Sequence, residues 1–395
     1  MDVSGVRAGV PTAPDHALIR AAVRAICAEY PDSYWRRLDA ADEYPEAFVT
    51  ALANAGWLAL LIPEAYGGAG LGLAEASIVL EEINHSGANS SACHAQMYIT
   101  AALARHGSED QKRRYLARIA AGELRLQAFG VTEPGAGSET TRIQTLARRD
   151  GDRYVIDGQK IWTSRAAYSD LLLLLARTTP YDELADKTRG LSLFVVDLRR
   201  AVAAGQIEIR PIETMINHAT SELFISGLDV PAEDRIGEEG MGFRYILDGW
   251  NAERILIAAE CIGDGRWFGD HAVAYARERV VFGRPIGQNQ GVQFPLARAY
   301  AMVEAADLMR WKAAALFDAG SPCGPEANMA KYLAAEASWE AANVCLDTFG
   351  GFGFAREYDV ERKFRETRLY RVAPVSQNLV LAFLGHNVLG LPKSY

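Results

Sequence analysis

One carboxylate, that of Glu253, lies where a helix would bury it with no basic residue in reach along the same helix. The apolar residues around it recur at helical steps of three or four positions, at Ile246, Trp250, Ile257 and Cys261. Because the positions three and four residues from Glu253 carry no positive charge, an intrahelical salt bridge is excluded. Burial raises the pKa of a carboxylate, which suits a general base. Glu253 is therefore the candidate base. Glu260, one heptad later on the same face, is the fallback candidate. The structural alternative is that Glu253 forms an ion pair with a distant arginine.

A second group of residues suits the binding of a flat ring with polar edges. The segment 130–138 follows a run of strand formers and is rich in small residues, with hydroxyls at Thr132 and Ser138. Small residues let backbone N–H groups approach a ring, and hydroxyls bond its polar edge. Trp162 offers an aromatic wall and Ser164 another donor. The structural alternative is a β-core that contains a buried tryptophan.

A third group combines positive charge with an aromatic face, which suits a nucleotide diphosphate. Arg279 supplies charge and Phe282 a stacking surface. The alternative is a solvated basic helix end, favoured by the helix dipole. The glycine-rich run 68–72 lacks the spacing and the preceding strand of a dinucleotide-binding fingerprint, so we interpret it as a loop.

Composition excludes several classes of function. A net charge of −9 and a pI near 5.4 argue against nucleic acid as a partner. The five cysteines are far apart, which predicts neither a metal site nor a disulfide framework and indicates a reducing compartment: Cys27, Cys93, Cys261, Cys323 and Cys345. The sequence shows no signal peptide and no apolar run long enough to span a membrane, so we expect a soluble cytoplasmic protein.

The periodicity of apolar residues and the runs of strand formers along the chain predict an α+β fold in three domains. Residues 1–123 have helical periodicity, residues 124–236 contain short runs of strand formers with turns between them, and residues 237–395 return to long helical periodicity. Closely spaced strands without intervening helices predict a central antiparallel barrel or sandwich. The last region predicts a four-helix bundle, with helices over 242–281, 290–318, 324–350 and 357–390.

Five motifs, in this order, resemble those of the acyl-CoA dehydrogenase family over nearly the whole chain. They are Gly56-Trp57 with Ile62–Gly68, Val131–Ser138, Gly158–Ser164, Arg279–Ile286 with Gln290, and Phe349–Phe354. The resemblance implies FAD as cofactor and an acyl-CoA thioester as substrate. It also implies α,β-dehydrogenation to the 2-enoyl-CoA and an electron-transferring flavoprotein as redox partner.

The resemblance also assigns roles to individual residues. It implies flavin contacts from Phe129, Val131, Thr132, Trp162 and Ser164, and places Ser138 on the CoA or flavin side. It implies further cofactor contacts, some reaching the FAD of a neighbouring subunit, from Arg279, Phe282, Gln290, Gly351 and Ser376. A homodimer or homotetramer follows from such sharing. Arg254 is expected to hold the CoA moiety, and Asp347 stands where the family has a glutamine.

The sequence departs from the family at the position of the usual base. Many members carry a catalytic glutamate near the C-terminus, where this chain has Pro374. A branch that includes isovaleryl- and long-chain acyl-CoA dehydrogenases carries its glutamate directly before an arginine, as in Glu253-Arg254 here. The alternatives are a relative that reoxidises its flavin with oxygen, as acyl-CoA oxidases and flavin monooxygenases do, and a non-catalytic FAD-binding protein. A branched or bulky acyl chain is the mild preference.

Overall fold

The computed structural model describes residues 14–393, which form two compact units. Within that range the helical unit comprises residues 14–36, 72–90 and 254–393, and the sheet unit comprises residues 37–71 and 91–253. Two helices continue from one unit into the other, α2 (Asp32–Ala41) and α9 (Gly242–Glu278). Within the described range, no helix is both long and apolar enough to cross a membrane.

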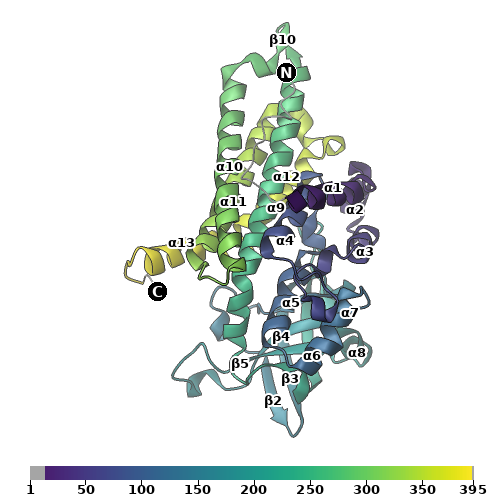
Figure 1. Cartoon of the computed structure of the whole chain (residues 1–395), viewed down its shortest axis with the longest axis vertical. Helices are drawn as coiled ribbons and strands as arrows, with labels where there is room; N and C mark the ends of the chain where they lie inside the picture. Colours follow the sequence, from purple (N-terminus) through teal and green to yellow (C-terminus); the bar gives the residue numbers. More distant parts are fainter. Residues whose placement is uncertain (1–13, 394–395) are drawn as a thin grey trace. The chain divides into compact units, whose positions relative to one another are not determined.

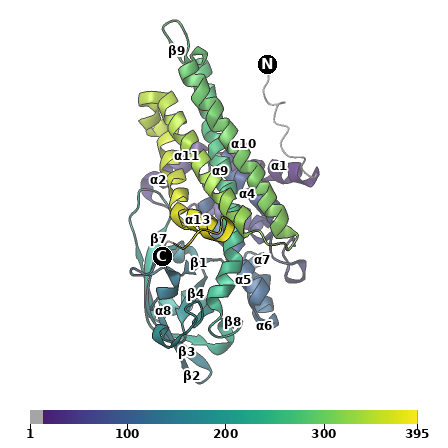
Figure 2. The ribbon, with the colours of Figure 1, turned by 90° about the vertical axis from the view of Figure 1, so that its left-hand side faces the viewer.

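The sheet unit is built on one eight-stranded sheet, and all of its strands except β6 are labelled in Figures 1 and 2. The strands are β1 (Leu126–Gly130), β2 (Leu146–Asp150), β3 (Arg153–Ser164), β4 (Leu171–Arg177), β5 (Leu191–Asp197), β6 (Ile207–Pro211), β7 (Thr220–Pro231) and β8 (Arg235–Ile236). Their order is β6-β7-β3-β2-β4-β5-β8, and β1 pairs with β4. Most pairs are antiparallel, as expected, but β4 pairs in parallel with both β1 and β2. These parallel pairs depend on a crossover connection, which local sequence patterns do not reveal.

The core of the sheet unit lies along the central strands. Every residue of β4 is buried, which explains its continuous run of leucines. The cluster around it includes Leu172, Leu174, Phe194, Val196 and Ile225. The remaining helices of the unit are α3 (Glu46–Asn54), α5 (His94–His106), α6 (Glu109–Gln111), α7 (Ala117–Ala120) and α8 (Leu198–Ala203).

The helical unit is dominated by long helices, as the periodicity predicts. Besides most of α9, it contains α1 (Pro14–Ala28), α4 (Leu73–His85), α10 (Gln290–Asp318), α11 (Gly324–Phe349), α12 (Val360–Arg368) and α13 (Gln377–Phe383). Two short strands, β9 (Val280–Val281) and β10 (Arg284–Pro285), form the turn at the far end of the α9–α10 hairpin (Figures 1 and 2). The helix expected over 357–390 is divided, because Pro374 has no N–H to continue it. The fold class is confirmed: helical, then β, then helical.

A buried ion network around Glu81 of α4 joins four helices of the helical unit. The carboxylate of Glu81 accepts hydrogen bonds from Arg20 at 2.8 Å and Arg310 at 2.9 Å, and from Arg266. Burial alone would raise the pKa of Glu81, but the charges of these three arginines outweigh it and hold that pKa well below 4.5. Glu81 shares the neutralisation of these three arginines with Glu82, Glu304 and Asp307.

Replacing Glu81 by glutamine is expected to destabilise the protein by about 1.5–3 kcal/mol, because the fully buried Arg310 loses one of its two carboxylate partners and keeps Asp307. The urea midpoint of unfolding measures the loss. The control is Glu208→Gln, which removes an exposed partner of Arg210 and is expected to change stability by less than about 1 kcal/mol. Equal effects of the two substitutions would contradict the role given to Glu81.

Candidate active site

The residues expected to hold the flavin meet where β1 and β3 end. The N–H of Ile161 donates to the carbonyl of Thr132 at 2.9 Å and ties the two segments together. The pairing of β3 with β7 shifts register between Lys160 and Thr163, where Trp162 adopts a left-handed conformation with φ of 60°. This irregularity leaves the indole 58% exposed, although tryptophans in such strands are usually buried. We call this part of the sheet unit the sheet edge.

The sheet edge fits a flavin ring on the chemistry of its donors. The side chains of Phe129, Val131, Thr132 and Ser164 are half-buried. Among the described residues, the hydroxyls of Thr132 and Ser164 have no hydrogen-bond partner, so both can bond the polar edge of a ring. Ser138 lies farther along the same loop and is exposed. The structure therefore brings the sequence-predicted flavin residues together, with one aromatic wall.

A buried ion pair anchors the loop that follows β1. The ammonium of Lys160 lies 2.8 Å from the carboxylate of Glu133 and also donates to the carbonyl of Val131 at 3.0 Å. Glu133 accepts backbone N–H groups as well, from Gln144 at 2.5 Å and Thr145 at 2.9 Å. Burial lowers the pKa of Lys160 to about 8, although the charge of Glu133 opposes the shift. Both residues stand inside motifs of the sequence, but only the folded chain shows that they pair.

A buried arginine beside Ser164 was not found from the sequence. Arg165 has a φ of 60°, is 4% exposed, and donates to the carbonyl of Ser91. The hydroxyl of Ser91 lies 3.1 Å from Nδ1 of His218. Burial, followed by the charges of Arg165 and His94, holds the pKa of His218 well below 6.5, so this imidazole is neutral at pH 7. No local spacing links these residues, because they come from separate loops of the sheet unit.

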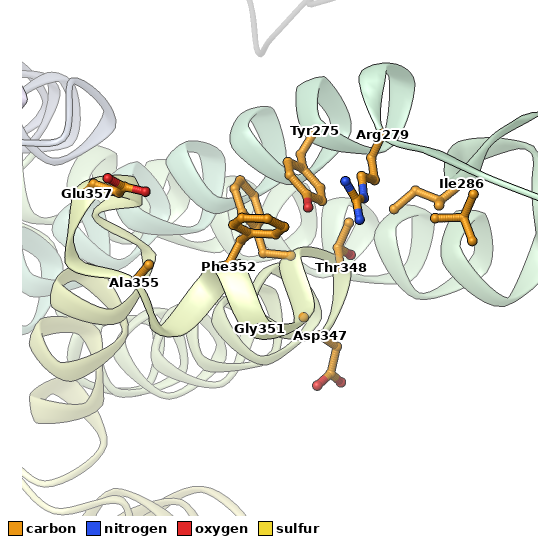
Figure 3. A pocket seen from close by; sticks show the side chains of 12 residues that line it. Tyr275, Arg279, Ile286, Asp347, Thr348, Gly351, Phe352, Ala355 and Glu357 are labelled. Atoms are coloured by element: carbon orange, nitrogen blue, oxygen red, sulfur yellow. The ribbon is translucent and has the colours of Figure 1, made fainter.

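The helical unit contains a pocket of about 660 Å³ that suits the nucleotide end of a dinucleotide. Figure 3 shows Arg279 and Tyr275 extending from α9 toward Phe352 on the glycine turn after α11. The guanidinium of Arg279 lies 5.5 Å from the ring of Phe352, and Gly351 lines the same pocket. A cation, an aromatic face and a glycine backbone fit an adenosine diphosphate group. The carboxylate of Asp347 points away from Arg279.

Three of the residues expected at this pocket are not among those that line it. Phe282 is fully exposed in the β9–β10 turn, and Gln290 is the exposed first residue of α10. The hydroxyl of Ser376 caps α13 by accepting the N–H of Leu379 at 3.4 Å. Contacts from these residues to a cofactor remain predictions.

The candidate base lies inside the long helix α9. Glu253 is 5% exposed, which confirms that the apolar stripe buries its carboxylate. Glu253 is the last residue of the sheet unit and Arg254 the first of the next segment of the helical unit, on one continuous helix. The sheet unit holds the preceding turns through His106, which lies 2.8 Å from Asp248 and stacks on Tyr245 at 4.2 Å.

The fallback residue Glu260 is fully buried in a polar cluster of the helical unit. Asn84 donates to the carbonyl of Glu260 at 3.3 Å and to Asp264 at 3.0 Å. Burial, followed by the charges of Glu260 and Asp264, raises the pKa of Tyr370 well above 10. Burial also raises the pKa of Asp264 to about 6, against the opposing charge of Lys363. Glu260 thus belongs to a cluster that packs helices together.

Comparison with known proteins identifies the family of the chain. Three family models match consecutive parts of the chain: the N-terminal domain of acyl-CoA dehydrogenases over residues 13–123, the middle domain over 128–228 and the C-terminal domain over 240–374. The chain therefore belongs to the acyl-CoA dehydrogenase family. It is an FAD-dependent oxidoreductase that acts on acyl-CoA.

Individual relatives cover almost the whole chain. Acyl-CoA dehydrogenase FadE12 of Mycobacterium tuberculosis is 36% identical over 382 residues, which is 95% of this chain and 96% of the relative. A glutaryl-coenzyme A dehydrogenase solved with glutaryl-CoA has a TM-score of 0.90 at 30% identity and covers 98% of both chains. A structure described as the electron transferring flavoprotein of Acidaminococcus fermentans has a TM-score of 0.89 at 27% identity, covering 96% of this chain and 99% of its own.

Substituting methionine for Lys160 is expected to destabilise the sheet unit by about 3–5 kcal/mol and to weaken FAD retention, because Glu133 keeps its charge without the ammonium. Urea unfolding and the flavin-to-protein absorbance ratio after gel filtration measure the two effects. Adding Glu133→Gln to the Lys160→Met variant should recover part of the loss, since the uncompensated charge is removed. A single variant with native stability and full FAD content would contradict the anchoring role.

Stability is expected to fall as the pH drops below about 6.5, partly because of His218. The unfolded chain takes up a proton at this histidine while the folded chain does not, so folding loses up to about 1.4 kcal/mol per pH unit in that window. The His218→Gln variant should show a shallower loss between pH 7 and pH 5 in urea unfolding. An unchanged slope would show that His218 titrates alike in both states.

Proposed function

We propose that this protein converts an acyl-CoA thioester to the 2-enoyl-CoA, with Glu253 as the base that removes the α-proton. One observation carries the assignment of the base. Glu253 is 5% exposed on α9 directly before Arg254, while Pro374 stands where most of the family has its glutamate. Proline has no group that takes a proton, whereas a carboxylate can act as a general base.

Other residues of the chain would hold the cofactor and the substrate. The bound FAD supplies the acceptor for the hydride that leaves the β-carbon. Trp162 would provide an aromatic wall for the flavin ring, and the hydroxyls of Thr132 and Ser164 would bond its polar edge. Glu253 holds the α-proton, and Arg254 positions the CoA moiety.

Glu260 is the weaker candidate because its surroundings already give it a structural role. It is fully buried beside Asn84, Asp264 and Tyr370, so it contributes to the packing of the helical unit. The segment that usually carries the base is also engaged, since the fully buried Lys331 donates to the carbonyl of Val375 at 2.6 Å. Because Glu260 and the segment at Val375 already make structural contacts, we favour Glu253 as the base.

The proposal includes partners and subunits. Arg279 and Gly351 would complete the cofactor site of a second copy, which makes the working form a homodimer or homotetramer. The similarity to the structure described as an electron transferring flavoprotein supports such a flavoprotein as the electron acceptor. All five cysteines are buried and none of these described residues forms a disulfide, which supports a cytoplasmic setting.

Replacing Glu253 by glutamine is expected to abolish reduction of the flavin by acyl-CoA while FAD remains bound, because the amide cannot take the α-proton. Anaerobic titration with straight and branched acyl-CoAs, followed at the long-wavelength flavin band, measures the reaction. The loss in rate is expected to exceed about a thousandfold, in line with removal of a general base.

Glu260→Gln is the matched control, one heptad along the same helix. We expect its flavin to bleach, although its stability falls. Bleaching of the Glu253→Gln variant at the wild-type rate would reject Glu253 as the base. Failure of every acyl-CoA to bleach the wild type would reject the reaction and favour a non-catalytic FAD-binding protein.

A further inference from the structure

One buried arginine of the sheet unit has no carboxylate to balance its charge. Arg165 is 4% exposed, and its guanidinium donates to the carbonyl of Ser91. Within residues 14–393, no carboxylate forms an ion pair with Arg165, and its Nε atom has no hydrogen-bond partner. Because a guanidinium keeps its proton in proteins, this positive charge is permanent. Burying an unpaired charge costs stability, which indicates that Arg165 has a function beyond folding.

Two titratable groups close to Arg165 are neutral at pH 7. The charge of Arg165 acts on both His218 and Tyr44. Burial, followed by this charge, holds the pKa of His218 well below 6.5, so the imidazole carries no proton charge. Burial raises the pKa of Tyr44 above its usual value, so the phenol keeps its proton. Neither group therefore cancels the charge of Arg165.

The position of Arg165 in the sheet unit is fixed beside a proposed flavin contact. Arg165 directly follows Ser164, whose hydroxyl is proposed to bond the polar edge of the ring. Its N–H donates to the carbonyl of Ala219 at 2.7 Å, and its φ is 60°, a conformation that residues other than glycine rarely adopt. Consecutive Cα atoms are about 3.8 Å apart, so a flavin ring at the sheet edge lies close to this charge.

The charge of Arg165 has a direct effect on flavin reduction. In the proposed reaction the substrate loses its α-proton to Glu253 and a hydride to the flavin. The hydride brings two electrons and one negative charge to a ring system that is neutral when oxidised. A positive charge nearby stabilises the reduced ring more than the oxidised ring. At about 10 Å and an effective dielectric constant of about 20, one unit charge shifts such an equilibrium by about tenfold.

We propose that Arg165 stabilises the negative charge of the reduced flavin and so raises its reduction potential. The hydrogen bond to Ser91 and the backbone bond to Ala219 hold the guanidinium in place without neutralising it. The inference rests on the proposed function, since it assumes that the flavin lies at the sheet edge. It adds a residue that acts on the cofactor by charge to those that contact the ring.

Anaerobic reduction of the holoenzyme beside a reference dye of known potential measures this effect without any substrate. The Arg165→Gln variant keeps a donor for the carbonyl of Ser91 but loses the charge. Its equilibrium constant for two-electron reduction should fall about tenfold, which is a decrease of about 30 mV in potential. The Arg165→Lys variant keeps the charge, so its equilibrium constant should stay within about twofold of the wild type.

Arg125→Gln is the matched control in the same unit. The guanidinium of Arg125 is paired with the carboxylate of Glu46 at 2.6 Å, so its charge is already balanced. We expect its removal to change the equilibrium constant by less than about twofold, because the exposed Glu46 is screened by solvent.

Two results would overturn the inference. One is an equal potential for the wild type and the FAD-bound Arg165→Gln variant. The other is an equal shift in the Arg165→Gln and Arg165→Lys variants, because the shape of the side chain would then matter and its charge would not. The measurement does not involve acyl-CoA. A shift confined to Arg165→Gln, in a protein whose flavin no acyl-CoA reduces, would therefore reject the proposed reaction and keep the role of Arg165.

Discussion

The buried pair of Glu133 and Lys160 is the interaction on which the sheet edge depends. It closes the loop after β1 onto β3, and the carboxylate also accepts two backbone N–H groups of the segment that leads into β2. A lone charge in that place would cost several kcal/mol, so neither residue is stable there without the other. The ion pair also fixes the positions of Thr132 and Trp162, because Thr132 directly precedes Glu133 and Trp162 lies two residues after Lys160.

The helical unit also contains buried charges that must be compensated, and their number is larger. Its helices bring arginines inside, and Glu81 contacts three of them while neighbouring carboxylates such as Asp307 share the compensation of their charge. A buried network of this kind adds little net stability compared with an apolar core, but it penalises alternative packings that leave a charge unpaired. A unit built this way holds α9 in register, and α9 carries both Glu253 and Glu260.

Local sequence patterns predicted the ends of some helices accurately. The helices α10 and α11 lie within a residue of their expected ends, because turn residues and helical periodicity agree there. The parallel pairing of β1 with β4 could not be predicted, since strand partners are chosen by contacts between distant segments. The same reason hid Arg165 and His218, whose roles come from loops brought together by the sheet.

The sequence by itself determined the family, the order of helical and β regions, and the burial of Glu253, because helical period and motif order are properties of the chain. Only the tertiary structure decided which charges pair, such as Glu133 with Lys160. The physical reason is that charge compensation depends on distances of a few ångströms between residues far apart in sequence, and spacing along the chain does not contain them.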